Sequence, residues 1–366
     1  MADPRGPRRP GAAGAAGRPR HRWKAPRGRG RRDDGVSASV PLSVGGRPAG
    51  LLHDGTDEPT DHSPRPFVHP LLTPGGVTVS GDRPSDHPWH HGLGIALSTV
   101  TVAGQAHPVN LWGGPTFLRG EGYVQLPNNG VQQVRSTDGR SADSRSSDAT
   151  EDRVRQQLVW RAADGAEVLA EERIWFVDAV RARGVDWFRT TVSSRWTNTG
   201  GGGLAFGSPT TSGRPDAGYG GFFLRLAQTF DGATVLGAPD PSPAGDPHRD
   251  AGGVRPPPPT AVELDEAEAM GRSGPWLGVR SATASVLMVP GRGGHGGPVP
   301  WFVRTTGTPM LCAAPFFHEE VALAPAATVE WAWSVLVADG AVPGAAFAAA
   351  ARVPFPAVGP TDPLGT

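Results

Sequence analysis

RVRQQLVWRAADGAEVLAEERIWFVDA, residues 153–179, decides the fold class of this chain. Apolar and polar residues alternate on both sides of Asp164-Gly165, a dipeptide that favours the tight turn of a β-hairpin. Segments of the same kind, rich in aromatic and β-branched residues, recur at 185–200, 278–291, 300–306 and 327–340. We therefore expect an all-β chain of many antiparallel strands, because strands do not alternate with helices along the sequence.

The residue types divide the chain into three segments. Residues 1–35 are rich in arginine, glycine and proline and cannot form a core, so this extension is expected to be disordered. Residues 36–342 are expected to form one large antiparallel β-sandwich. Residues 343–366 include AAFAAAARV (345–353), which predicts a short C-terminal helix and a tail. Surface loops are expected where proline, glycine and polar residues gather, at 136–153, 238–260 and 290–298.

The formal net charge of zero conceals an uneven distribution of charged residues. Residues 1–32 contain ten arginines and Lys24 against one acidic residue, which leaves 24 basic and 34 acidic residues, a net charge of −10, in the rest. An acidic body disfavours a nucleic-acid partner. Because Lys24 is the only lysine, Schiff-base chemistry and a lysine general base are excluded from the body of the chain.

Cysteine content and hydropathy set further limits. Cys312 is the single cysteine, so no internal disulfide or thiolate cluster can form, and a metal would need His, Asp or Glu ligands. No apolar stretch is long enough for a spanning helix, and the arginine-rich start lacks the apolar segment of a secretory signal. The expected location is the cytoplasm, without a membrane partner.

Three of the eleven histidines lie close together in DHPWHHGLG, residues 86–94. If a strand begins at Gly92, one face carries apolar residues and the other small ones: Leu93, Ile95, Leu97 and Thr99 against Gly94, Ala96 and Ser98. Extending this alternation puts His91 with the leucines and His90 with the small residues. Because Pro88 cannot donate a ladder hydrogen bond, Asp86 and His87 are expected in the preceding turn. The three imidazoles should therefore not converge on one point.

Three interpretations of this stretch stay open. An acid/base or ligand-binding role needs one histidine, His87 or His90, oriented by a carboxylate such as Asp86. A structural role needs only histidines that satisfy backbone groups at a tight corner. A metal site would need His87 and His91 with a distant third ligand: His69, His318 or Glu319. No cofactor is firmly implied, although a divalent metal is possible.

Other polar and aromatic residues gather near glycines, as ligand-binding residues often do at strand ends. The only two tyrosines, Tyr123 and Tyr219, occur in RGEGY and DAGYGG. The segment VNLWGGPTFLRGEGY adds Asn110, Trp112 and Glu121. His318 and Glu319 precede an apolar segment. Four arginines are candidates for binding carboxylates or sugar hydroxyls: Arg83, Arg119, Arg225 and Arg304.

Several of these motifs carry a resemblance to a known family. RPFVHPLLTPGGVTVSGDRPSDHPWHHGLGIAL, VNLWGGPTFLRGEGYVQLPNNG and GYGGFFLR are similar to the bacterial family labelled "methane oxygenase PmoA", over residues 36–342. More distantly, the chain resembles galactose-mutarotase-like proteins, which bind sugars on a sheet face and use His with Glu or Asp as acid and base. The family label implies a subunit of a membrane copper monooxygenase, which a chain without a spanning segment contradicts. The resemblance marks Arg65, His69, Asp86, His87, His90, Asn110, Trp112, Glu121 and Tyr123.

Together these observations predict a protein that binds a small-molecule carbohydrate or sugar acid. It would catalyse proton transfer, as in epimerisation or elimination, with His87, His90 and Asp86 as the catalytic residues. The substrate-binding residues would be Arg65, His69, His91, Asn110, Trp112, Glu121, Tyr123, Tyr219, His318 and Glu319. The alternatives are a metal-dependent oxygenase or hydrolase and a non-catalytic sugar-binding module. The oligomeric state is not predicted.

Overall fold

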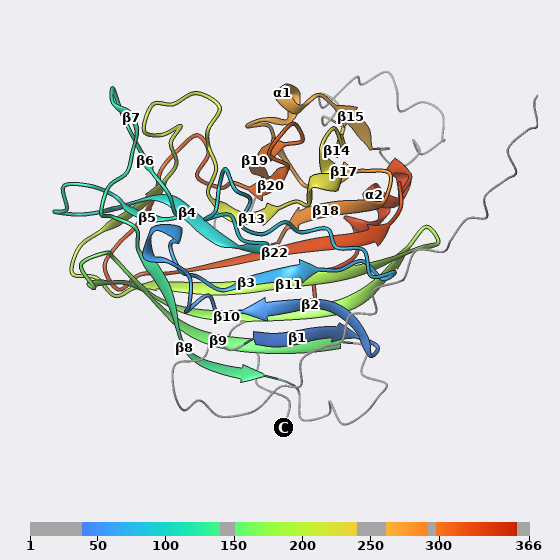
Figure 1. The fold of residues 1–366 in the computed structure, drawn as a ribbon, viewed down its shortest axis with the longest axis horizontal. Helices are drawn as coiled ribbons and strands as arrows, with labels where there is room; N and C mark the ends of the chain where they lie inside the picture. Colours follow the sequence, from blue (N-terminus) through green and yellow to red (C-terminus); the bar gives the residue numbers. More distant parts are fainter. Residues whose placement is uncertain (1–38, 140–150, 240–260, 292–297, 357–366) are drawn as a thin grey trace, which may run out of the picture.

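A computed structural model describes residues 39–139, 151–239, 261–291 and 298–356. The expected disordered extension, residues 1–35, lies outside the described residues, as do most of the expected loops. The described chain forms two large antiparallel sheets that face each other, together with one small hairpin (Figure 1). The expected all-β antiparallel sandwich is confirmed.

The first sheet has eleven strands in the order β1-β2-β3-β4-β13-β20-β19-β16. Strands β5 and β12 also pair with β4, and β21 pairs with β12. Its strands are β1 (Ser39–Val44), β2 (Arg47–His53), β3 (Phe67–Leu71), β4 (Leu93–Val102), β5 (Val109–Leu111), β12 (Leu204–Gly207), β13 (Gly221–Arg225), β16 (Ser273–Gly274), β19 (Val299–Arg304), β20 (Met310–Ala313) and β21 (Val321–Leu323). Strand β4 is the junction of this sheet, because it pairs with β3, β13, β12 and β5.

The second sheet has nine strands in the order β15-β14-β17-β18-β22-β11-β10-β9-β8. Its strands are β8 (Val131–Gly139), β9 (Glu151–Arg161), β10 (Glu167–Ala182), β11 (Val185–Asn198), β14 (Thr234–Gly237), β15 (Val262–Leu264), β17 (Leu277–Arg280), β18 (Ala284–Pro290) and β22 (Thr328–Asp339). The hairpin predicted at Asp164-Gly165 joins β9 to β10. The expected loop at 136–153 is shorter than predicted, since β8 continues to Gly139 and β9 begins at Glu151.

The remaining elements are small. The β6–β7 hairpin (Thr116–Leu118 and Gly122–Val124) projects from the end of the molecule at which β5 lies (Figure 1). Two 3₁₀ turns, η1 (Thr60–His62) and η2 (Gln228–Phe230), and the helix α1 (Glu266–Ala269) lie in connections between strands. The predicted C-terminal helix is α2 (Gly344–Ala350), which buries Phe347 against Trp187 and Trp276.

The main core fills the space between the two sheets, and its residues come from both. A buried polar network crosses this core. Gln132 of β8 donates from Nε2 to the carbonyl of Ile95 on β4 over 2.8 Å, and its Oε1 accepts from Arg173 over 2.8 Å. Arg173 is also paired with Glu171 through two hydrogen bonds of 2.7 Å. This network connects β8 and β10 of the second sheet to β4 of the first.

A separate apolar cluster covers the outer face of the first sheet, on the side away from the main core. Ala96 of β4, Phe223 of β13, Cys312 of β20 and Phe302 of β19 belong to it. The sequence predicted a face of small residues on β4, and this is that face. Because Gly94 and Ala96 carry little or no side chain, larger groups from neighbouring segments can lie over the strand.

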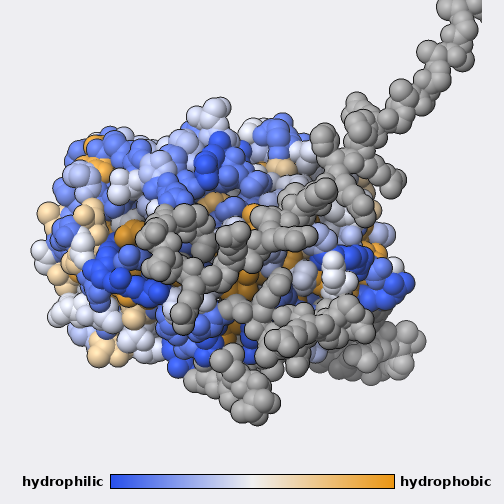
Figure 2. All heavy atoms as spheres, turned by 60° about the horizontal axis from the view of Figure 1, so that its bottom comes forward, coloured by the Kyte–Doolittle hydropathy of each residue, from blue (hydrophilic) through white to orange (hydrophobic). Residues whose placement is uncertain are grey.

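The surface of the described residues is largely polar. Tyr123 is the one exposed large hydrophobic residue in the described ranges, with 41% of its surface accessible. The face in Figure 2 is mostly hydrophilic wherever its residues are described, with small apolar patches between. Among the described residues, no helix is both long and apolar enough to cross a membrane.

Candidate functional site

The site is built around the corner that leads into β4. The backbone NH of Arg83 donates to the carbonyl of His90 over 2.9 Å, and the backbones of Asp82 and His91 pair as an isolated antiparallel β-bridge. The segment between these paired residues therefore forms a loop. Gly92 follows with a φ of +25°, and a Cβ there would lie 2.1 Å from the carbonyl oxygen of Val68. A glycine is therefore required at this position, and regular strand alternation begins only after it.

This corner explains a wrong prediction. Alternation extended back from β4 placed His90 and His91 on opposite faces of the sheet. His90 lies on the face of Gly94, as predicted, but His91 lies on the same face, because Gly92 interrupts the alternation. His91 stacks on Phe67 and His90 contacts Phe223, with ring centroids 4.8 Å and 5.3 Å apart. Phe67 and Phe223 pair with Gly94 from its two sides, so the two imidazoles flank the strand and belong to separate clusters.

The first cluster runs from a carboxylate through two imidazoles to aromatic rings, and we call it the aromatic track: Asp86, His87, His90, Trp112, Tyr219 and Tyr123. It begins in the turn, as predicted, where Nδ1 of His87 lies 2.8 Å from Oδ2 of Asp86. The His87 ring stacks on His90 at 4.8 Å with an interplanar angle of 22°. The His87 side chain is 39% exposed. Among the described residues, its Nε2 has no hydrogen-bond partner.

The electrostatics of these residues differ with their exposure. The hydrogen bond from His87 is the main cause that lowers the pKa of Asp86, so this carboxylate stays ionised. His90 is only 2% exposed, and burial, with the nearby His87 and Arg225, holds its pKa well below the usual value of a histidine. His90 is therefore neutral and supports His87 from beneath, whereas His87 is the imidazole that a ligand can reach.

Trp112, Tyr219 and Tyr123 continue the track. Trp112 lies edge-on to His90 at 5.5 Å and packs against Tyr219 at 4.6 Å. The hydroxyl groups of Tyr219 and Tyr123 share a hydrogen bond of 2.9 Å, and Arg214 donates a second one to Tyr123. Burial, followed by the nearby Tyr123, raises the pKa of Tyr219 well above its usual value. Tyr219 therefore stays protonated and acts as a hydrogen-bonding group.

Two predicted binding residues hold the track in place. Oδ1 of Asn110 accepts the backbone NH groups of Trp112 and Gly113 over 2.9 and 3.0 Å, and its amide donates to the carbonyl of Gly114 over 3.1 Å. Arg65 is buried and donates to the carbonyl of Trp89 over 2.8 Å. Both side chains are engaged with the backbone, so the structure places them in the scaffold of the site.

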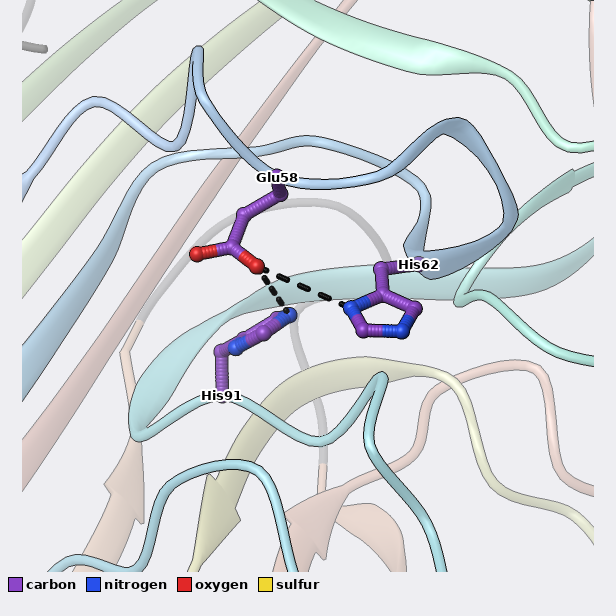
Figure 3. Close-up of side chains that lie close together, drawn as sticks. All are labelled: Glu58, His62 and His91. Carbon is purple, nitrogen blue, oxygen red and sulfur yellow. Dashed lines mark ion pairs between the residues drawn. The ribbon is translucent and has the colours of Figure 1, made fainter.

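A second cluster lies on the other side of Gly94 and consists of Glu58, His62 and His91 (Figure 3). We call it the Glu58 cluster. Glu58 Oε2 lies 3.6 Å from His62 Nδ1 and 3.6 Å from His91 Nε2. The opposite nitrogen of His91, Nδ1, lies 2.9 Å from Oδ1 of Asp82.

The surroundings of the Glu58 cluster lower the pKa of both His91 and Asp82. Burial is the main cause that lowers the pKa of His91, and the hydrogen bond to Asp82 only partly opposes it. For Asp82, burial acts to raise the pKa, but the hydrogen bond with His91 and nearby positive charges outweigh it, so the pKa is lowered. Arg83 donates to Oε1 of Glu58 over 2.5 Å, which leaves Oε2 for the histidines.

Among the described residues, the other predicted residues make no hydrogen bond or ring contact with the aromatic track. His69 contacts Ser80, with Nδ1 2.9 Å from its hydroxyl oxygen, and burial lowers its pKa. His318 donates to the carbonyl of Gly271 over 2.8 Å. Glu319 is exposed beside it, and Glu121 is exposed in the turn between β6 and β7. The predicted metal set of His87, His91 and a distant ligand is not assembled, since His87 and His91 belong to different clusters.

Sequence reasoning missed several residues of the site. Glu58 and His62 stand four residues apart, and the 3₁₀ turn η1 brings them together. That spacing was the available signal, but the contact with His91 depends on the fold. Arg214 reaches Tyr123 across 91 residues, and no local pattern indicates this.

Comparison with known proteins places the chain in a family. Residues 39–352 match the family of unknown function DUF6807, and the chain belongs to it. None of the comparisons supports the expected PmoA label. No curated protein matches the sequence.

Similarities to solved structures are low. The galactosidase domain of the alpha-galactosidase-sucrose kinase AgaSK matches at 9% identity and a TM-score of 0.36, over 72% of this chain and 32% of that one. A polysaccharide lyase matches at 12% identity and a TM-score of 0.28, over 84% and 33%. A galactose mutarotase related enzyme from Lactobacillus acidophilus matches at 9% identity and a TM-score of 0.29, over 84% of this chain and 99% of that one. This chain thus spans about a third of the first two proteins. TM-scores of this size carry no inference about its activity or substrate.

Proposed function

We propose that this protein binds a carbohydrate or sugar acid over the aromatic track and transfers a proton with His87. The observation that carries the proposal is the pair of His87 and Asp86. The carboxylate accepts a hydrogen bond from Nδ1 of His87 over 2.8 Å, which leaves the lone pair on Nε2 of a side chain that is 39% exposed. An imidazole held in this tautomer is suited to act as a general base.

In the proposed reaction, Nε2 of His87 takes a proton from a carbon next to a carbonyl or carboxyl group of the bound ligand. Asp86 stabilises the imidazolium that forms, since its lowered pKa keeps it ionised. Delivery of a proton from water to the opposite face of the same carbon gives epimerisation. Departure of a group from the neighbouring carbon, with the proton now held on His87, gives elimination. Each outcome conserves atoms without a further reactant.

Arg225 supports an acidic ligand. It is 4% exposed, and among the described residues its Nη1 has no hydrogen-bond partner. Burial lowers its pKa, and the nearby carboxylate of Asp86 opposes this effect. The Arg225 guanidinium lies near Asp86 and His90, and its positive charge favours an anionic ligand, so a sugar acid suits the site better than a neutral sugar.

A binding experiment tests the proposal. Calorimetric titration with a panel of uronic, aldonic and neutral sugars should show binding of one or more sugar acids. The variant Arg225→Met should weaken acid binding about 10- to 100-fold, because the lost charge-assisted hydrogen bond is worth about 1.5–3 kcal/mol. Arg181→Met, at an exposed position of β10, is the matched control and should bind as the wild type does. If Arg225→Met and the wild type bound sugar acids with equal affinity, the proposed preference for sugar acids over neutral sugars would be contradicted.

A further inference from the structure

Glu58, His62 and His91 bring three potential ligand atoms within 4.8 Å of one another. We propose that they form a binding site for a divalent first-row transition-metal ion, with Asp82 as the outer carboxylate that orients His91. This site is distinct from the aromatic track and does not depend on the function proposed for it.

The spacing of the three ligand atoms fits a metal better than direct hydrogen bonds. Both contacts from Oε2 of Glu58, to Nδ1 of His62 and to Nε2 of His91, measure 3.6 Å, which is too long for a hydrogen bond. Ligands about 2.1 Å from a tetrahedral ion lie about 3.4 Å from one another. In Figure 3, both nitrogens face the same carboxylate oxygen. A small closure would therefore complete the three-ligand geometry.

The hydrogen bonding of the histidines supports the same conclusion. Nδ1 of His62 and Nε2 of His91 are buried and have no hydrogen-bond partner among the described residues. Nδ1 of His91 is engaged by Asp82 at 2.9 Å, so Nε2, the nitrogen that faces Glu58 at 3.6 Å, is the one left to bind an ion. A metal ion between this nitrogen and the carboxylate oxygen would satisfy both groups.

The surrounding residues match the usual second layer of a metal site. A histidine ligand commonly donates its other ring NH to a carboxylate, and His91 has this arrangement with Asp82 at 2.9 Å. Arg83 holds Oε1 of Glu58, and Arg65 donates to the carbonyl of His62 over 2.9 Å. These contacts fix the orientation of the ligands before an ion binds.

Two imidazoles and one carboxylate define the class of ion. Imidazole ligands suit zinc, iron, nickel and copper, whereas magnesium and calcium prefer oxygen ligands. Three protein ligands leave at least one position for water or for an oxygen of a ligand, as in catalytic rather than structural sites. The side chain of His62 is 13% exposed, which gives an ion a route to the cluster.

The test is metal binding by the full chain, purified without a histidine tag and stripped with a chelator. Zinc titration by calorimetry and cobalt titration by visible absorption should both give one ion per chain. The variants His62→Asn and Glu58→Gln should weaken binding at least about 100-fold, and Asp82→Asn about 10- to 100-fold. Because His62 lies in the 3₁₀ turn η1, outside the main core, its variant should stay folded, which circular dichroism can verify.

Two histidine controls separate this site from the aromatic track. His318→Asn removes an exposed histidine, and His87→Asn removes the general base proposed above; both should bind zinc as the wild type does. Absence of stoichiometric zinc and cobalt binding by the folded wild type would overturn the site, as would wild-type affinity in His62→Asn. If the protein binds a sugar acid but no metal, only the metal site is overturned. If it binds the metal but no sugar acid, only the proposed function is overturned.

Discussion

His90 and His91 are neighbours in the chain and have different surroundings. His90 lies beneath His87 and beside Trp112, whereas His91 lies between Asp82 and Glu58. Their separation depends on Gly92, whose backbone passes too close to Val68 for any side chain. Both histidines are buried, and burial is the main cause that lowers the pKa of each.

The lowered pKa values predict a pH dependence of stability. A histidine whose pKa is 6.5 in the unfolded chain and lower in the folded chain binds a proton more readily when the chain is unfolded. Its contribution to stability is therefore complete above pH 6.5 and falls as the pH decreases below it. For His90, the loss approaches about 1.4 kcal/mol per pH unit.

Urea unfolding at pH 8, 7, 6 and 5 checks this expectation. The variant His90→Gln should lose less stability between pH 7 and pH 5 than the wild type does. His318→Gln, at an exposed position, should retain the wild-type pH dependence. A His90→Gln profile parallel to that of the wild type would show that His90 is not the buried neutral group described above.

The segment that follows β5 is the element that connects the predicted motifs. Asn110 holds the backbone of Trp112 and Gly113, and the ring of Trp89 packs on the turn at Gly114. A Cβ at Gly114 would lie 2.5 Å from that ring, so the turn and the histidine corner fit together only with glycine there. The shape of the aromatic track thus depends on a buried amide that is engaged with the backbone.

Replacing Asn110 with alanine should reduce both stability and ligand binding. The change leaves the buried NH groups of Trp112 and Gly113 without an acceptor, at a cost of about 1–3 kcal/mol for each group. Chemical unfolding gives the loss of stability, and the titration of sugar acids gives the loss of affinity. Gln125→Ala, at an exposed position in the same region, should leave both unchanged. Unaltered affinity in a folded Asn110→Ala protein would refute the link between this segment and the track.

At the scale of the whole molecule, local patterns in the sequence predict the sheets better than the site. Alternation and Asp164-Gly165 define the β9–β10 hairpin, and an alanine-rich run defines α2. The pair of Asp86 and His87 is adjacent in the chain and could be predicted. The meeting of Tyr123 and Tyr219 depends on strand order, which local periodicity does not specify.

The Glu58 cluster shows the same limit. Glu58 and His62 are brought together by one 3₁₀ turn, but their approach to His91 depends on the pairing of β3 with β4 and on the break at Gly92. Strand alternation alone assigned His91 to the wrong face. Long-range pairing and a single irregular backbone position therefore determine which histidines become neighbours.

Hydrogen exchange at a ligand carbon tests the central claim most directly. Wild-type protein is incubated in D₂O with the sugar acids that it binds, and the ¹H NMR signal of the C–H next to the carbonyl or carboxyl group is followed. We expect solvent deuterium to replace this proton. His87→Asn should slow the replacement by about 100- to 10,000-fold while the protein stays folded, and Arg181→Met should exchange normally. Retention of the proton on every bound ligand, or exchange at the wild-type rate by His87→Asn, would contradict a proton-transferring role of His87.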